Sequence, residues 1–380
     1  MKQAFINGAI FTGDEVLHGY TLYCEGERIS ALTSGDPASE YDGEIIDLDG
    51  KRLVPGFIDL QVNGGGGVLF NDDTSAAGIE AIVKAHQPYG TVAMLPTLIS
   101  DSHDKIAAAV QATDDAIEQS VAGVLGVHLE GPFLNPCRKG VHNPDYFSAL
   151  EHDFVPMLSA LRHGRTLVTM APEQSELAVI RQLTERGVLV FAGHTGADYQ
   201  QTKAALEQGL CGFTHLFNAM TPMQSREPGV VGAALEDKHS WCGLIVDGYH
   251  VSNATLKVAI AAKQNGKMVL VTDAMPSVGA ESKSFTLNGE LITASEGRCA
   301  TAADTLAGSD LDMISAVRNC VQWLDLDWQE AIRMASRYPA ECLGVQNDYG
   351  SIRAGFKASF LCVDEQLNIS GVWVEGSRVS

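Results

Sequence analysis

Short apolar runs, each ending on a polar residue, recur along most of the chain and define its main pattern. Eight such runs can be counted, at residues 56–61, 91–97, 124–130, 166–173, 188–194, 212–215, 242–247 and 268–273. Their length and their aliphatic, β-branched content are typical of strands that are buried on both faces. The chain is therefore expected to contain a large parallel sheet.

The stretches between these runs have helical spacing. Residues 198–209 include apolar Ala204, Ala205 and Leu206 and stop at Gly209, and residues 251–266 have Ser252 near their start as a suitable N-cap. A strand followed by a helix, repeated eight times, is the pattern of an α/β fold of the (β/α)8 TIM barrel type.

Both ends of the chain depart from this pattern. Residues 4–10, 20–25, 28–32 and 44–48 form short alternating runs that predict antiparallel strands, and the same texture returns from about residue 350. We therefore expect one small β-sandwich domain built from residues 1–53 and 345–380, and a barrel domain over residues 54–344. Inside the barrel domain, residues 285–300 predict a β-hairpin excursion with turns at 288–289 and 296–297, residues 305–310 a loop, and residues 313–324 and 328–343 two helices.

Polar groups end several of the predicted strands. In a (β/α)8 barrel the active site lies at the carboxyl ends of the strands, where this sequence has Gln61, Glu130, His194, His215, Asp247 and Asp273. A single histidine in an apolar run is usually a core residue, and Asp247 could simply cap the next helix. Two histidines on successive strand tips together with Glu130, however, predict a metal site with open positions for water.

Composition and charge narrow the possible partners. The formal net charge of −21 argues against nucleic acid and anionic membranes as partners. An anionic small substrate then requires local positive charge, which the loop carrying Arg138, Lys139 and His142 could supply. The eight cysteines lack metal-type spacing and predict reduced thiols, and without an export-type apolar segment at the first residues a cytoplasmic location is expected.

The first predicted strand carries a family resemblance. Residues 55–59 read Pro-Gly-Phe-Ile-Asp, and here the sequence resembles the amidohydrolase superfamily, whose first barrel strand normally ends on a His-x-His metal pair. This chain has Gln61 and Asn63 at those two positions. Because amides are poor ligands for a transition metal, we expect one metal ion per chain and not two.

Further motifs sharpen the resemblance. The segments at residues 128–132, 139–143, 193–194, 214–220, 226–229, 247–250 and 272–274, in this order, resemble the family of N-acetylglucosamine-6-phosphate deacetylases. The resemblance implies that Glu130, His194 and His215 hold one divalent metal ion. Zinc is the first expectation, with iron, cobalt or manganese as alternatives.

The same resemblance implies roles for other residues. Asp273 would act as general base and then general acid, and His142 is the candidate donor to the oxyanion. A homodimer is implied in which Arg226 reaches the phosphate in the neighbouring active site. The predicted substrate-binding residues are Gln61, Val141, His142, Asn218, Ala219, Arg226, Asp247, Gly248, Tyr249, His250, Leu306, Ala307 and Gly308.

Two alternatives remain open at this point. An amidohydrolase with this site could act on a different N-acyl or cyclic amide, since barrel and metal do not select a substrate. A non-catalytic relative could keep the barrel as a binding module, but it would not need Glu130, His194, His215 and Asp273 together.

Overall fold

The structure is a computed structural model that describes residues 1–37 and 39–380. The chain divides into two compact units. The first comprises Met1–Asp59, His86–Ala93 and Met313–Ser380, and the second comprises Leu60–Ala85 and Met94–Asp312.

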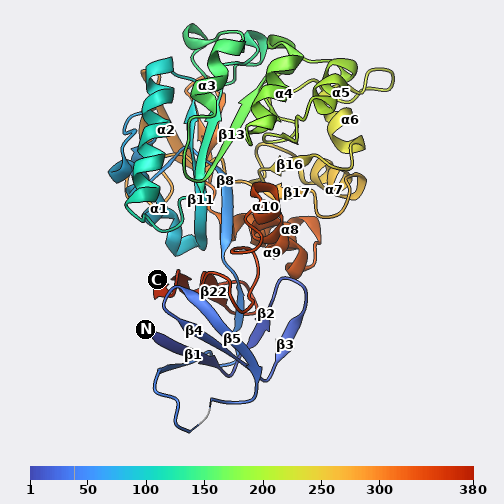
Figure 1. Ribbon diagram of the computed structural model, residues 1–380. Helices are drawn as coiled ribbons and strands as arrows, with labels where there is room; N and C mark the ends of the chain where they lie inside the picture. Colours follow the sequence, from blue (N-terminus) through green and yellow to red (C-terminus); the bar gives the residue numbers. More distant parts are fainter. Residues whose placement is uncertain (38) are drawn as a thin grey trace. The chain divides into compact units, whose positions relative to one another are not determined.

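An eight-stranded parallel sheet forms the barrel (Figure 1). Its strands are β8 (Phe57–Val62), β11 (Thr91–Ile99), β12 (Gly126–Glu130), β13 (Arg165–Met170), β14 (Leu189–Ala192), β15 (Gly212–Phe213), β16 (Trp241–Leu244) and β17 (Met268–Leu270), paired in chain order. A parallel bridge between Val62 and Ala274 joins the first strand to the last and closes the barrel. All eight predicted strands are therefore confirmed, and the carboxyl ends of these strands meet at one mouth.

Helices separate most of the barrel strands. They are α1 (Ala76–His86), α2 (His103–Glu118), α3 (Val155–Leu158), α4 (Leu177–Glu185), α5 (Tyr199–Glu207), α6 (Gly229–Glu236) and α7 (Asn253–Ala262). Asp198 closes a capping box with Gln201 at the start of α5, and Ser252 caps α7 by accepting from the Thr255 amide. Both helix starts lie where the sequence predicts them, and Ser252, not Asp247, is the cap of α7.

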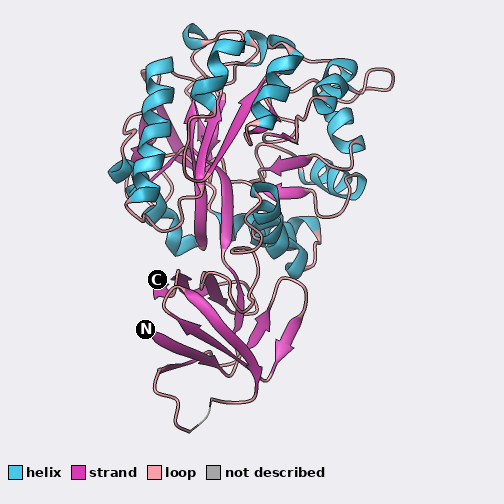
Figure 2. Cartoon of the chain, viewed as in Figure 1, coloured by secondary structure: helices cyan, strands magenta, loops and turns pink. Residues whose placement is uncertain are grey.

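After β17 the chain leaves the barrel pattern for a four-stranded antiparallel sheet of β18 (Ser284–Leu287), β19 (Glu290–Ser295), β20 (Arg298–Ala300) and β21 (Leu306–Ser309) (Figure 2). Its first two turns have the positive φ angles of the predicted turns, with Asn288 at 50° and Glu296 at 53°. The predicted loop at 305–310 is wrong, because β21 pairs with β20. Ser309 also accepts from the Met275 amide, which holds this small-residue segment extended.

The first unit contains two further sheets. One has the order β5-β4-β1-β6 and the other β24-β23-β22-β7-β2-β3. The strands are β1 (Lys2–Ile6), β2 (Ala9–Phe11), β3 (Val16–His18), β4 (Tyr20–Glu25), β5 (Arg28–Ser34), β6 (Glu44–Asp47), β7 (Arg52–Pro55), β22 (Phe360–Val363), β23 (Ile369–Val374) and β24 (Ser377–Arg378). Buried side chains from both sheets share one core, in which Phe5 packs edge-on against Phe360 and Trp373. This is the expected β-sandwich of the chain ends.

Two predicted details of this unit are wrong. Residues 4–10 do not form one strand, because Asn7 adopts a φ of 56° and the chain passes from β1 in one sheet to β2 in the other. In addition, the pairs β1–β6 and β2–β7 are parallel, not antiparallel. A long connection separates the strands of each pair, and such a connection permits parallel pairing where a tight hairpin does not.

The C-terminal helices follow the prediction with one break. Helix α8 spans Met313–Leu324 as expected, but residues 328–343 form two helices, α9 (Trp328–Ala335) and α10 (Arg337–Leu343). Ser336 lies between them with non-helical φ and ψ angles of −131° and −73°. Pro339 has no N–H and its ring would clash with the carbonyl of Ala335 in a continuous helix, which accounts for the break.

Among the described residues, no helix combines the length and apolar character required to cross a membrane. The remaining short strands, β9 (Gly64–Gly65) and β10 (Val68–Leu69), form a two-stranded ladder directly after β8. All eight cysteines are free thiols, as the sequence predicts.

Candidate active site

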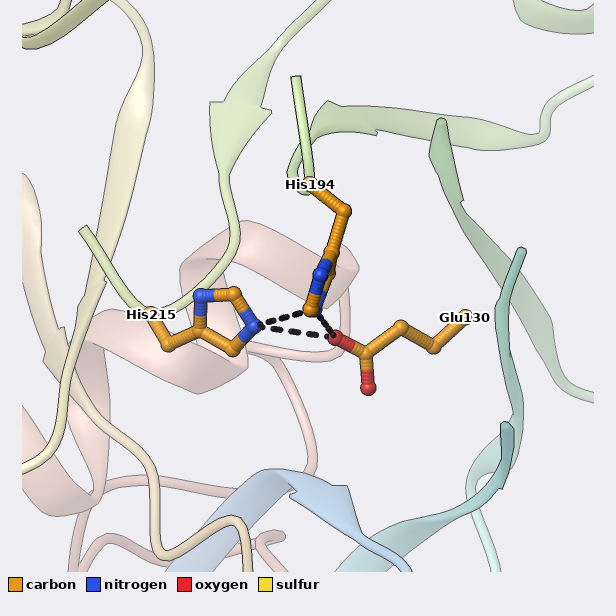
Figure 3. Close-up of side chains that lie close together, drawn as sticks. All are labelled: Glu130, His194 and His215. Atoms are coloured by element: carbon orange, nitrogen blue, oxygen red, sulfur yellow. Dashed lines mark hydrogen bonds and ion pairs between the residues drawn. The ribbon is translucent and has the colours of Figure 1, made fainter. Parts of the chain in front are cut away.

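Three buried side chains from different strand ends meet at the barrel mouth (Figure 3). Oε1 of Glu130 lies 3.0 Å from Nε2 of His215 and 3.3 Å from Nε2 of His194. The two Nε2 atoms are 3.1 Å apart. One carboxylate oxygen and two ring nitrogens therefore point toward a common centre, and these are the residues predicted as metal ligands.

The protonation of His194 follows from its contacts. Its Nδ1 lies 2.8 Å from the carbonyl oxygen of Arg138, which can only accept, so Nδ1 carries the proton. In the neutral ring the lone pair of Nε2 then faces the carboxylate of Glu130 without a hydrogen between them. His215 adds a second Nε2, and its Nδ1 is buried without a partner in the described part of the chain. Acceptors that converge in this way fit a divalent cation, and two imidazoles with one carboxylate are a donor set suited to zinc or a similar transition metal.

Left-handed backbone occurs at three of the strand ends that form the site. The φ angles are 48° at His194, 33° at His215 and 54° at Asp273. Residues other than glycine rarely adopt this conformation because the Cβ atom crowds the backbone. Such outliers concentrate at functional sites, where the surrounding structure must hold them.

Asp273 lies across the site and is held by two amides. Nδ2 of Asn63 donates to its Oδ1 at 2.6 Å, and Nε2 of Gln61 donates to the same oxygen at 3.1 Å. Gln61 also donates to Oε2 of Glu130 at 3.1 Å. The barrel closure places the two segments together, because the Asp273 amide donates to the carbonyl of Gln61. The two residues that replace the usual histidine pair thus orient carboxylates.

The two carboxylic acids of the site have pKa values shifted in opposite directions. For Glu130, burial alone would favour the neutral acid, but the hydrogen bonds that His194 and His215 donate when their rings are protonated hold its pKa well below the usual value. For Asp273, burial and the nearby negative charge of Glu130 raise the pKa. An acid whose pKa is lowered next to one whose pKa is raised is the arrangement of a ligand beside a proton carrier.

His142 lies beside the ligand group with a defined tautomer. Its Nδ1 accepts from the backbone amide of Ser100 at 3.3 Å and lies 2.8 Å from the hydroxyl of the same residue. The neutral ring therefore carries its proton on Nε2. Burial and the positive charge that His194 can carry lower the pKa of His142 to about 3, which keeps the ring a neutral donor. Its ring centroid is 4.4 Å from that of His194.

A cavity of about 260 Å³ opens on these groups. Its lining consists of Asn63, Ile99, Glu130, Gly140, Val141, His142, His194, His215, Asn218, Ala219, His250, Asp273, Met275, Thr305, Leu306 and Gly308. Most of the predicted substrate-binding residues are among them. The volume suits a small molecule.

Some predicted residues lie outside this lining, as far as the described residues extend. Asp247 accepts Nδ1 of His250 at 2.6 Å and holds this ring at the cavity wall. The hydroxyl of Tyr249 donates to the carbonyl of Glu296. Gly248 and Ala307 are neighbours of lining residues in the chain, Gln61 contacts the carboxylates behind the wall, and Arg226 is exposed.

Sequence reasoning missed several groups of the site. Ile99, Met275 and Thr305 line the cavity, and Ser100 fixes the tautomer of His142. Ser100 follows a predicted strand end by only a few residues, so its position was a usable signal. Of the basic loop, Arg138 contributes its carbonyl oxygen and not its charge, while Lys139 is exposed.

Comparisons with known proteins agree on one family. A model of the amidohydrolase family matches residues 52–379. An N-acetylglucosamine-6-phosphate deacetylase of Haemophilus influenzae is 36% identical over 381 aligned positions, covering 99% of each chain. An N-acetylgalactosamine-6-phosphate deacetylase of a Shewanella species is 38% identical, covering 87% of this chain and 83% of its own. The crystal structure of an N-acetylglucosamine-6-phosphate deacetylase from Pasteurella multocida superposes with a TM-score of 0.95 at 35% identity, covering 100% of this chain and 99% of its own.

Proposed function

The chain belongs to the amidohydrolase family, and on that premise we propose that it hydrolyses N-acetyl-D-glucosamine 6-phosphate to D-glucosamine 6-phosphate and acetate. The observation that carries this proposal is the meeting of Glu130, His194 and His215 opposite a base, Asp273, in a cavity that is sized for a sugar. Full-length similarity to deacetylases of this substrate supports it.

The chemistry assigns a separate task to each group. A divalent cation held by Glu130, His194 and His215 would lower the pKa of a water molecule and polarise the amide carbonyl. Asp273, held through one oxygen by Asn63 and Gln61, takes the proton of the attacking water. The Nε2–H of His142 donates to the carbonyl oxygen as negative charge develops there.

The second half of the reaction returns the proton. As the C–N bond breaks, protonated Asp273 gives its proton to the departing nitrogen, and the water oxygen remains in acetate. The raised pKa of Asp273, caused by burial and by the charge of Glu130, favours uptake of the proton by this side chain before it is passed on. One side chain therefore serves as base and then as acid.

Recognition of the phosphate is proposed for Arg226 and His250. Asp247 accepts one ring nitrogen of His250, so the other is available at the cavity wall. Arg226 offers a planar fork for two phosphate oxygens, but it is exposed in its own chain. We therefore propose a homodimer in which Arg226 enters the neighbouring active site. The local positive charge would offset the net charge of −21 toward an anionic substrate.

The metal ion and the location belong to the same proposal. We propose one metal ion per chain, zinc first, with iron, cobalt or manganese as alternatives. The cytoplasm is the proposed location, since the proposed substrate is a phosphorylated sugar.

The decisive experiment measures acetate release from N-acetylglucosamine 6-phosphate by the purified protein, before and after chelation and after restoring zinc, iron, cobalt or manganese. N-acetylgalactosamine 6-phosphate is the second substrate, because a relative with that activity is 38% identical. Metal-dependent release from the glucosamine derivative supports the proposal. Release from the galactosamine derivative alone would replace the sugar and keep the mechanism, and release from neither would refute the proposed function.

Mixing two defective variants tests the trans role of Arg226. Asp273→Asn lacks the base, and Arg226→Ala lacks the proposed phosphate fork. In a mixed dimer one site would combine an intact Asp273 with an intact Arg226 from the other chain, so activity at low substrate concentration should return. Mixtures no more active than the sum of their components would show that Arg226 does not act in trans.

A further inference from the structure

Glu173 makes an unusual set of contacts although no role above requires it. It lies in a short 3-10 turn, Pro172–Gln174, directly after β13, the neighbour of strand β14, which leads to His194. Its Oε1 accepts from Nδ2 of Asn135 at 2.8 Å and from the Gly196 amide at 2.5 Å. Its Oε2 accepts from the Thr195 hydroxyl at 2.5 Å. Three donors from two segments thus end on one carboxylate, and two of them immediately follow His194.

These contacts belong to a closed hydrogen-bond network around His194, which we call the Glu173 network. Asn135 donates its backbone N–H to the carbonyl of His194 at 2.9 Å, and its side chain donates to Glu173. Asn135 also caps the turn Pro136–Arg138, which ends at the carbonyl that accepts Nδ1 of His194. The backbone and the ring of His194 are therefore both bound to a segment that Glu173 holds from behind.

The Glu173 network is tightly packed at Gly196. A Cβ atom added at Gly196 would lie 2.9 Å from Nδ2 of Asn135 and 3.5 Å from Oε1 of Glu173. The first distance is shorter than real Cβ contacts, so a side chain at position 196 would displace the Asn135 amide, whereas the second is an ordinary contact. The Thr195 amide donates in turn to the carbonyl of Ala219, which lines the cavity. Loosening the Glu173 network would consequently move the metal ligand His194 and the cavity wall at Ala219.

The backbone conformation of His194 has to be held in place by its surroundings. With a φ of 48°, His194 is in a conformation that the isolated chain would not favour. Such a residue keeps its position only where its surroundings over-determine it. A metal ligand also needs a fixed ring orientation, which its outer hydrogen-bond partners supply.

We propose that Glu173 is a positioning residue that fixes His194, backbone and ring, in the orientation needed to bind the metal ion. The proposal rests on the metal site of the proposed function and adds to it a residue behind the ligands. This role differs from that of an ordinary stabilising carboxylate. Loss of the Glu173 carboxylate should weaken metal binding more than it weakens the fold.

Two variants disrupt the hydrogen bonds of the Glu173 network in different ways. Glu173→Gln keeps the shape, but its NH₂ group must face at least one of the three donors. Gly196→Ala pushes the Asn135 amide away from Glu173 while leaving the carboxylate in place. For outer partners of a metal ligand, metal affinity typically falls about 10- to 100-fold, and we expect both variants to fall in that range.

A matched control is available at Asp114. This buried carboxylate on α2 likewise accepts backbone amides, from Arg162 at 3.0 Å and His163 at 2.9 Å, but its partners lie outside the site. Asp114→Asn should lower the melting temperature of the metal-free protein and leave the metal dissociation constant unchanged.

The experiment measures zinc affinity by competition with a chromophoric chelator, the visible spectrum of the cobalt-loaded protein, and the melting temperature of the metal-free protein. Weaker zinc binding and an altered cobalt spectrum in Glu173→Gln and Gly196→Ala, with neither change in Asp114→Asn, support the proposal. Unchanged zinc affinity in a folded Gly196→Ala would overturn it, even if Glu173→Gln did not fold. Equal weakening in Asp114→Asn would overturn it too, as general loosening. If the unchanged protein bound no metal, the metal site itself would fall, and with it both proposals.

Discussion

Replacement of Asp273 by asparagine separates the proton carrier from the metal site. The carboxylate receives both amide donors, Asn63 and Gln61, on its Oδ1. In the variant, the amide oxygen can occupy that place and accept both hydrogen bonds, so no buried donor loses its partner. What disappears is the second oxygen, the only part of the side chain that can take up a proton from water.

The expected loss can be set from that single change. General base and acid catalysis by one positioned group contributes about 10²- to 10⁴-fold, which at about 1.4 kcal/mol per factor of ten is roughly 3 to 5.5 kcal/mol of transition-state stabilisation. The loss should fall on kcat, with KM little changed, because Asp273 is not one of the proposed phosphate contacts. Metal content should remain, since Asp273 lies outside the group formed by Glu130, His194 and His215.

The assay is acetate release at saturating substrate, with metal content measured on the same samples. Glu130→Gln is the contrasting variant, because it should lose the metal together with the activity. Asp114→Asn serves as the control for removing a buried carboxylate elsewhere. A metal-loaded Asp273→Asn protein that keeps activity within about tenfold of the unchanged enzyme would refute Asp273 as the proton carrier.

Four further outcomes are expected. Arg226→Ala should raise KM for the phosphorylated sugar about 10- to 100-fold, the value of about 1.5 to 3 kcal/mol for hydrogen bonds to a charged group; an equal effect on the unphosphorylated sugar would contradict the role. His142→Phe should lower kcat by about 10²- to 10³-fold with metal retained, because one oxyanion donor is lost, and an unchanged kcat would exclude His142 as that donor. Elemental analysis should find one metal ion per chain, and two tightly bound ions would show that Gln61 and Asn63 do not prevent a second site. Asp114→Asn should lower the free energy of unfolding by about 1 to 3 kcal/mol at pH 7, and denaturant titrations should show the difference vanishing in acid.

The acid dependence in the last case follows from the sign of one pKa shift. Burial alone would raise the pKa of Asp114, but the amides of His163 and Arg162 and the Arg162 side chain lower it below the ordinary 3.8. A carboxylate with a lowered folded-state pKa stabilises the folded protein fully when the pH is above its ordinary, unfolded-state pKa. This contribution is lost as the pH falls through the lowered, folded-state pKa. The two proteins should therefore converge once the pH has fallen below the lowered pKa of Asp114, and a difference that persists there would show that packing, not charge, causes it.

The barrel could be predicted because its strands are buried on both faces. Such strands read as continuous apolar runs, so even the two residues of β15 (Gly212–Phe213) were found from the run that ends at His215. The same regularity placed six polar groups at one mouth, and three of them meet there as possible ligands. Local rules also located the cap at Ser252 and the helix that starts at Asp198.

What the sequence did not reveal depends on contacts between distant segments. The pairing of β21 rests on backbone partners at Asp273 and Met275, which no local pattern near residues 306–309 announces. The break at Ser336 needed a decision that Pro339 would stop a helix and not bend it. The support of His142 by Ser100 likewise joins segments that are adjacent only in the folded barrel.

The amides at positions 61 and 63 link the expected single metal to the proposed base. Histidines at positions 61 and 63 would direct nitrogen lone pairs toward the site and favour binding of a second metal ion. Gln61 and Asn63 instead present N–H donors, which repel a cation and attract carboxylates. The oxygen of Asp273 that faces them is thereby occupied, and the carboxylate is oriented without being drawn into a metal site. Because Glu130 is close and the group is buried, the pKa of Asp273 is raised despite these donors. An acid in that state can accept a proton and return it, which a metal-bound carboxylate could not do as readily.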